Sequence, residues 1–212
     1  MLTRSLFALL ASACALAPLH AQTDATAQEN SALVSSPVTQ DESPAERTAR
    51  LNAVLDRYQG RWVGTIEIRS LTRVIQTIQI EQQYWWDEID GIKVLKGQAV
   101  LASMGTLSAS ESRTYIEAGN IYSETDQEGR QHFFIGKVSD DGRKISWLPA
   151  DDADPLARKV TDTFSDGPEG PVLTVEGYEE VPVGDNRALL TMRGELKRAG
   201  DMSHGPLAMP QR

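Results

Sequence analysis

The chain has 212 residues, of which 40% are hydrophobic and 24% charged, so it has enough apolar residues for a packed core and wholesale disorder is excluded. Its net charge of -9 argues against a surface that binds nucleic-acid phosphates, which requires clustered positive charge. A single cysteine excludes both an intrachain disulfide framework and a metal cluster held by several thiolates.

Residues 1–21 have the pattern of a secretory signal peptide: Arg4, an apolar stretch, and a small residue, Ala21, before the expected cleavage site. The stretch is shorter than the roughly 20 residues that a membrane-spanning helix needs. We therefore expect an exported protein, periplasmic or secreted, with no membrane span. Cys14 follows Ala11-Ser12-Ala13, a poor match to a lipoprotein box, so a lipid anchor at Cys14 is the less favoured alternative.

The next segments are a predicted disordered leader over 22–42 and a helix that begins after Ser43. Ser43 and Glu46 have the spacing of a capping box around Pro44. Apolar residues then recur at helical spacing up to Tyr58, and Gly60 can end the helix. Such an amphipathic helix is expected to pack on the domain. The tail, 200–212, has no periodicity and is predicted to be disordered.

Between Arg61 and Arg198 the pattern has period two, which indicates strands. We expect eight to ten strands with turns at Asp90-Gly91 and at 140–142, and one β-prone segment over 113–125 with a bend at Gly119. A parallel sheet is disfavoured because no long helix interrupts the strands. The predicted fold class is all-β, a single antiparallel barrel or sandwich that forms one domain, 43–199, with the N-terminal helix.

Gly60-Arg61-Trp62, at the junction of the helix and the first strand, resembles the G-x-W motif of lipocalins. The wider sequence to Ile66, with the final Gly194–Arg198, is similar to a bacterial family of exported lipocalin-like barrels of unknown function. The resemblance implies a lipocalin-like barrel in which Gly60, Trp62 and Arg198 form the closure, with Arg198 stacked on Trp62. Thr161-Asp162-Thr163 matches the second lipocalin motif, T-D-Y, only loosely.

The leading functional prediction is a non-catalytic binding protein that holds a small, largely apolar ligand inside the barrel. An envelope structural or interaction protein with a filled barrel is the alternative. The residues expected to point inward and contact the ligand are Ile66, Ile68, Trp86, Phe134, Trp147, Leu190 and Met192. In Tyr84-Trp85-Trp86, the two adjacent tryptophans must face opposite sides of a strand.

Catalytic and metal chemistry have little support in the sequence. His132 is a conceivable haem ligand if it faces inward with Phe134, but a single imidazole is thin support. The acidic loop at Asp151, Asp152 and Asp154 does not have the spacing of an EF-hand, and Glu179-Glu180 is expected to lie in a turn. Nucleophile-elbow, P-loop and dinucleotide motifs are missing. We therefore expect no catalytic residues, no metal and no cofactor.

Overall fold

The computed structural model describes residues 42–127, 129–150, 158–183, 186–200 and 207. The predicted signal peptide, Cys14, most of the predicted leader, the acidic loop at 151–154 and most of the predicted tail lie outside the described residues.

One helix precedes the strands. Helix α1 spans Pro44–Leu55 and is followed by the short 3-10 helix η2, Asp56–Tyr58. The capping box predicted from the sequence is present: the Ser43 hydroxyl accepts a hydrogen bond from the Glu46 amide at 3.3 Å, and the Glu46 carboxylate accepts one from the Ser43 amide at 2.9 Å. No described helix is long and apolar enough to cross a membrane.

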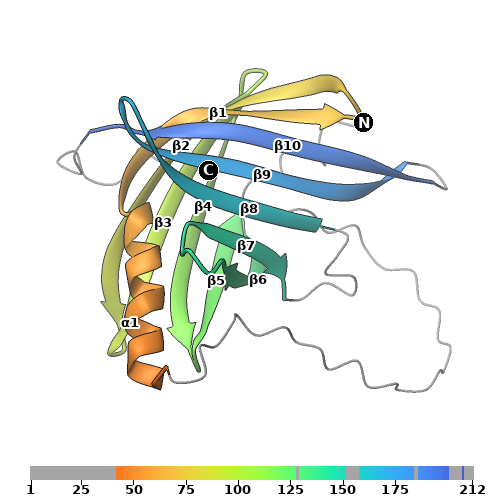
Figure 1. Cartoon of the computed structure of the whole chain (residues 1–212). Coiled ribbons are helices and arrows are strands. Elements are labelled where there is room, and N and C mark those ends of the chain that lie inside the picture. Colours follow the sequence, from red (N-terminus) through yellow and green to blue (C-terminus); the bar gives the residue numbers. More distant parts are fainter. Residues whose placement is uncertain (1–41, 128, 151–157, 184–185, 201–206, 208–212) are drawn as a thin grey trace, which may run out of the picture.

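Ten antiparallel strands form one closed barrel, in the order β1-β10-β9-β8-β7-β6-β5-β4-β3-β2 (Figure 1). The all-β fold class and the strand count expected from the sequence are confirmed. The strands are β1 (Gly60–Ser70), β2 (Arg73–Ile89), β3 (Ile92–Ser103), β4 (Thr106–Glu117), β5 (Asn120–Gln127), β6 (Arg130–Val138), β7 (Lys144–Pro149), β8 (Arg158–Gly167), β9 (Gly170–Val183) and β10 (Asn186–Arg198).

Tight turns connect neighbouring strands. Asp90 and Gly91 both have positive φ, 52° and 78°, which fits the two-residue turn whose twist matches a β-hairpin. The segment 113–125, expected as one bent strand, is two strands: Ala118 and Gly119 have φ of 47° and 74° and turn the chain fully between β4 and β5. Alanine at the first turn position gave no sequence signal for a hairpin, because it seldom adopts this conformation.

A second correction concerns Glu179 and Glu180. Both lie within β9, not in a turn, and face opposite sides of the barrel wall. Glu179 is buried, whereas Glu180 is exposed and forms an ion pair with Arg187 on β10 at 2.9 Å. An adjacent pair of acidic residues is compatible with a strand because successive side chains point to opposite faces.

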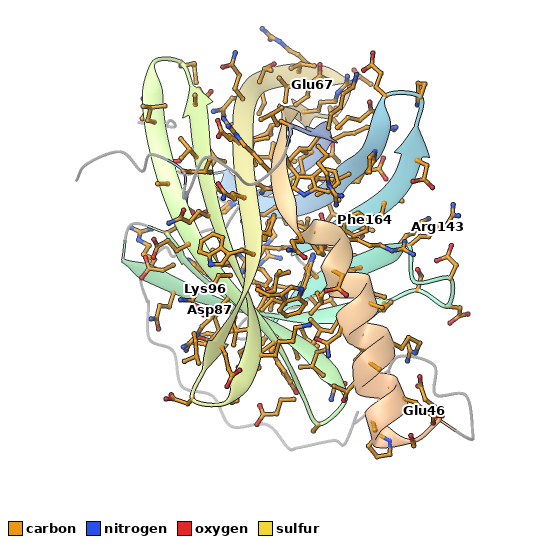
Figure 2. The ribbon with its side chains drawn as sticks, turned by 90° about the vertical axis from the view of Figure 1, so that its left-hand side faces the viewer. Glu46, Glu67, Asp87, Lys96, Arg143 and Phe164 are labelled. Carbon is orange, nitrogen blue, oxygen red and sulfur yellow. The ribbon has the colours of Figure 1, made fainter. Side chains whose placement is uncertain are left out.

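Helix α1 closes one end of the barrel. Its residues Leu51, Val54 and Leu55 are buried in the barrel core. Figure 2 shows the helix lying across this end, with Phe164 of β8 beside its C-terminal end. Below the helix, the ring of Tyr58 packs edge-on against Phe164 with the centroids 4.7 Å apart.

Trp62 lies under this helical cover and is completely buried. Its indole Nε1 donates a hydrogen bond to the Tyr58 carbonyl oxygen at 2.7 Å. The guanidinium carbon of Arg198 lies 4.9 Å from the centre of the Trp62 ring, the stacking implied by the lipocalin resemblance, and Trp62 and Arg198 are direct partners in the β1–β10 register. Arg193 faces outward, as its parity predicts, and pairs with Glu176 at 3.2 Å.

Candidate functional site: a cavity inside the barrel

The barrel interior is packed on one side and hollow on the other. β1, β2 and β10 fill their side with large apolar residues such as Ile66, Ile78 and Leu196, which are fully buried. On the opposite side lies a cavity of about 130 Å³. A cavity of roughly 150 Å³ in an engineered protein accommodates benzene, so this space suits a guest of about one aromatic ring.

Small side chains on three adjacent strands make the space. In the register, Gly97 of β3, Ser112 of β4 and Thr125 of β5 form one row across the inner wall. The neighbouring rows contribute the inward-facing Ala99, Ser110, Thr114 and Ser123. None of these side chains is large, so the interior beside this wall stays open. On the packed side, the larger side chains of Ile and Leu fill the corresponding space.

The row at Gly97 also holds an aromatic residue in place. Tyr84 of β2 is the register partner of Gly97, and its ring lies against the glycine: a Cβ at position 97 would approach Tyr84 Cε1 to 2.6 Å. Glycine is therefore needed here to let the ring lie close to the wall. Tyr84 contributes to the cavity lining, and its ring centroid is 5.3 Å from that of Tyr58.

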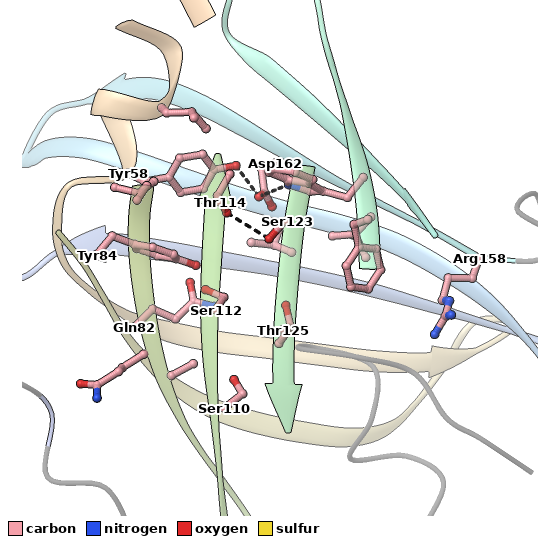
Figure 3. Close-up of a pocket in the computed structure, with 18 residues that line it drawn as sticks. Tyr58, Gln82, Tyr84, Ser110, Ser112, Thr114, Ser123, Thr125, Arg158 and Asp162 are labelled. Atoms are coloured by element: carbon pink, nitrogen blue, oxygen red, sulfur yellow. Dashed lines mark hydrogen bonds between the residues drawn. The ribbon is translucent and has the colours of Figure 1, made fainter. Parts of the chain in front are cut away.

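A buried carboxyl group lies on the cavity wall nearest the helix (Figure 3). Asp162 of β8 is 9% exposed. Its Oδ2 accepts hydrogen bonds from the Tyr58 hydroxyl at 2.6 Å and from Trp147 Nε1 at 2.9 Å. Two donors on one oxygen fix the orientation of the carboxyl group, so the group has a defined position relative to the cavity.

Burial governs the protonation of these groups. It raises the pKa of Asp162, while the hydrogen bonds from Tyr58 and Trp147 oppose that increase. Burial, and secondarily the Asp162 charge, raise the pKa values of Tyr58 and Tyr84. Both phenols therefore stay protonated at neutral pH and act as hydrogen-bond donors or ring surfaces.

The Asp162→Asn substitution should change how stability depends on pH. Folding raises the pKa of the Asp162 carboxyl group. The folded protein therefore keeps the Asp162 proton over a pH range in which the unfolded chain has already lost it. We compare the free energies of unfolding of the native protein and of Asp162→Asn. The value for the native protein should decrease relative to that for the variant as the pH rises. The decrease should begin near the pKa of Asp162 in the unfolded chain and end above its pKa in the folded protein. Urea unfolding of both proteins, from about pH 3.5 to 8, measures this difference.

Other carboxyl groups do not obscure this comparison. Hydrogen bonds lower the pKa values of exposed groups such as Glu46 and Asp141, so these groups lose stabilisation as the pH falls. They are present in both proteins, and their contributions cancel in the difference. A difference in the free energy of unfolding that does not vary with pH would contradict the raised pKa of Asp162.

Only some of the seven sequence-predicted ligand residues line the cavity. Phe134 and Trp147 do. Ile66, Ile68, Leu190 and Met192 face inward and are buried, but in the packed part of the interior. Trp86 lies at the helix-closed end, where its Nε1 donates a hydrogen bond to Asp56 at 2.6 Å and Lys93 Nζ lies 3.8 Å from its ring centre.

Sequence reasoning missed the polar half of the site. Asp162, Tyr58, Tyr84, Gln82 and Arg158 line the cavity together with the hydroxyl residues of β4 and β5. A signal was present in β4, where Ser108, Ser110, Ser112 and Thr114 alternate with other residues at strand period. The pattern marks a face of small polar groups, but it does not indicate whether that face points into the barrel.

His132 faces inward with Phe134, the orientation that its haem hypothesis required. Its side chain is 7% exposed, but it is not among the residues that line the cavity. Among the described residues, no group of three or more His, Cys, Asp or Glu side chains is arranged to hold a metal ion.

A second depression, of about 450 Å³, is lined mainly by charged and polar side chains of the outer wall around Trp85, and it also reaches the row of Gly97, Ser112 and Thr125. Ion pairs already join charged residues there: Lys96 pairs with Asp87 at 2.7 Å, and Arg113 pairs with Glu124. Trp85 faces opposite to the inward-pointing Tyr84 and Trp86, as expected for successive residues of a strand. We therefore place the candidate site in the interior cavity.

Comparisons with known proteins assign the chain to no family. The chain is similar to the S-type phycobiliprotein lyase CPES from Guillardia theta at 9% identity and a TM-score of 0.45, over 71% of this chain and 93% of that one. A structure of MucB in complex with MucA(peri) shares 9% identity over 72% of this chain and 94% of that one, with a TM-score of 0.13. No family model matches the chain, and a search of curated proteins finds no match. The closed antiparallel strand order under a helical cover identifies the fold as a lipocalin-like barrel.

Proposed function

We propose that this chain is an exported, non-catalytic binding protein whose barrel holds a small, largely apolar ligand. The observation that supports this most directly is the interior cavity, next to an otherwise densely packed core. A barrel with a purely structural role has no need of such a space, since inward side chains can fill a small barrel completely. The signal-peptide pattern of residues 1–21 motivates export.

The lining supports a ligand with both apolar and polar parts. Leu95, Val160 and Val175 offer aliphatic surface, and Phe134 and Trp147 offer aromatic surface. Hydroxyl groups face them across the cavity, and Thr114 Oγ1 donates a hydrogen bond to Ser123 Oγ at 3.0 Å. Apolar walls with a few placed polar groups are typical of small-molecule sites, where burial supplies affinity and the polar groups set orientation.

The protonation of the two lining tyrosines argues against a role for either as a general base. A general acid or base works best with a pKa near the operating pH. Tyr58 and Tyr84 have raised pKa values that keep them protonated, and two hydrogen bonds hold the Asp162 carboxyl in place. These properties suit a fixed recognition surface.

Native mass spectrometry of the mature protein from its own cells tests the proposal. We expect an additional mass that is lost on denaturation, in a protein that begins at Gln22. The Ala99→Leu variant fills part of the cavity from β3 and should carry less of this additional mass. Val100→Leu, which adds a methylene group at the adjacent position facing the other side of the same strand, should leave it unchanged.

Three results would count against the proposal. A bare protein mass, together with no binding of aromatic probes of benzene size, would indicate that the cavity does not function as a binding site. An additional mass that is equally abundant in Ala99→Leu and in the native protein would place the ligand elsewhere. A mature protein that starts at Cys14 or Met1 would contradict the export route that we propose.

A further inference from the structure

The carboxyl group of Asp162 has one oxygen left for a ligand. Its Oδ2 accepts both hydrogen bonds, from Tyr58 and from Trp147, and no described residue donates to Oδ1. No ion pair joins Asp162 to a lysine or arginine among the described residues. A carboxyl group that is 9% exposed and lines a cavity thus has no ion pair within the part of the chain that the structure describes. Buried carboxylates are costly unless such a partner compensates them.

Three aromatic side chains, those of Tyr58, Tyr84 and Trp147, line the cavity together with Asp162. Tyr58 and Tyr84 lie with their ring centroids 5.3 Å apart, and Trp147 is held by its hydrogen bond to Asp162 (Figure 3). The negative face of an aromatic ring attracts an organic cation, and rings arranged around a cavity are a known means of recognising ammonium groups. Ring faces and a carboxylate therefore favour the same kind of ligand.

The other charged side chain of the lining lies at a distance from this position. Arg158 is four residues before Asp162 on β8, which separates their Cα atoms by about 13 Å along an extended strand. Glu179, also buried, is directly opposite Arg158 in the β8–β9 register. The positive charge of Arg158 is therefore accompanied by a negative one, and Arg158 lies well apart from Asp162 (Figure 3).

We propose that the cavity binds a small organic cation, a protonated amine with an aromatic or compact apolar body, whose ammonium group donates a hydrogen bond to Asp162 Oδ1. This inference rests on the proposed binding function and specifies its ligand class. The volume of about 130 Å³ matches a body of one aromatic ring. An ammonium group beside the carboxylate favours the ionised form and so offsets the effect of burial on the pKa of Asp162.

Three probes of the same shape and different charge test the proposal. Isothermal titration calorimetry of the mature protein at pH 7 would compare benzylamine, a cation, with neutral benzyl alcohol and anionic benzoate. We expect benzylamine to bind at least about tenfold more tightly than benzyl alcohol, because a charge-assisted hydrogen bond is stronger than a neutral one. Benzoate should bind most weakly, because its carboxylate would meet that of Asp162.

The Asp162→Asn variant isolates the charge. Asparagine has nearly the same shape, so the preference for benzylamine over benzyl alcohol should disappear while benzyl alcohol still binds. Asp166→Asn, an exposed position on the same strand that is not among the residues lining the cavity, is the matched control and should keep the preference. If Asp162→Asn does not fold, the three-probe comparison on the native protein still decides the question.

The outcomes separate this inference from the proposed function. Binding of benzyl alcohol with no preference for benzylamine would overturn the cation proposal and leave the cavity as a binding site. A preference for benzylamine that survives in Asp162→Asn would also overturn it, since another group would then recognise the charge. No binding of any of the three probes would count against the cation proposal and the binding function together.

Discussion

Replacing Trp62 with alanine is expected to lower the free energy of unfolding by about 3–5 kcal/mol. Trp62 is fully buried, its Nε1 donates to the Tyr58 carbonyl at 2.7 Å, and its ring lies between Phe164, with centroids 6.2 Å apart, and the Arg198 guanidinium. Truncation would leave a void beneath the helical cover and remove one partner of each contact. Urea unfolding followed by circular dichroism measures the loss from the shift of the midpoint at constant slope.

Trp85→Ala is the matched comparison for Trp62→Ala. It removes the same side chain from the barrel, but from the partly exposed outer face of β2. Since little void forms at such a position, the loss should be well below that of Trp62→Ala. Equal losses in the two variants would show that Trp62 does not have the central packing role that its burial indicates.

Gly64→Ala is expected to cost about 3 kcal/mol, the upper part of the range for overpacking. A Cβ at position 64 would overlap the Glu195 carbonyl oxygen and lie 2.9 Å from Leu196 Cα. Both are backbone atoms of β10, so no side-chain rotation relieves the contact, and the two strands that close the barrel would have to separate. The shift of the urea midpoint again measures the effect.

Gly105→Ala separates crowding from backbone conformation. Gly105 has a φ of 78°, and a Cβ there would meet nothing within 4 Å. Its substitution should cost about 1–2 kcal/mol, the penalty of a left-handed conformation for a residue with a Cβ. A loss in Gly105→Ala greater than in Gly64→Ala would mean that β1 and β10 adjust more readily than their close approach indicates.

The helix and the barrel closure were the most predictable parts of the fold. The capping box at Ser43 and Glu46 is a local pattern, and the apolar spacing to Tyr58 predicts which face of the helix is buried. Leu190 and Met192 of β10, predicted to point inward, are both buried inside the barrel. Each of these inferences depends on a few neighbouring residues and on a strong contrast between apolar and polar positions.

The site was harder to predict because it depends on distant residues. Asp162 accepts a hydrogen bond from Tyr58, which is 104 positions away in the sequence, and no local sequence pattern predicts such a hydrogen bond. On β4 both faces carry polar residues, since Ser112 points inward and its neighbours Glu111 and Arg113 point outward. Alternation then cannot assign a face. An apolar–polar alternation therefore does not predict a cavity that is lined by hydroxyl groups.

In the described part of the chain, the β1–β10 pairing stands apart from the others because it joins strands from opposite ends of the domain. Every other pairing joins strands that follow each other in sequence and can form by local zipping. A chain emerging during synthesis therefore keeps the edge of β1 unpaired until β10 is complete, and unpaired edges are sites of aggregation. The start of β1 and the end of β10 lie side by side in the finished barrel, whereas helix α1 carries the N-terminal end of the domain to the β4–β5 turn, where Arg47 lies against Gly119. A circular permutant would therefore retain every strand pairing only with a linker long enough to span the helix.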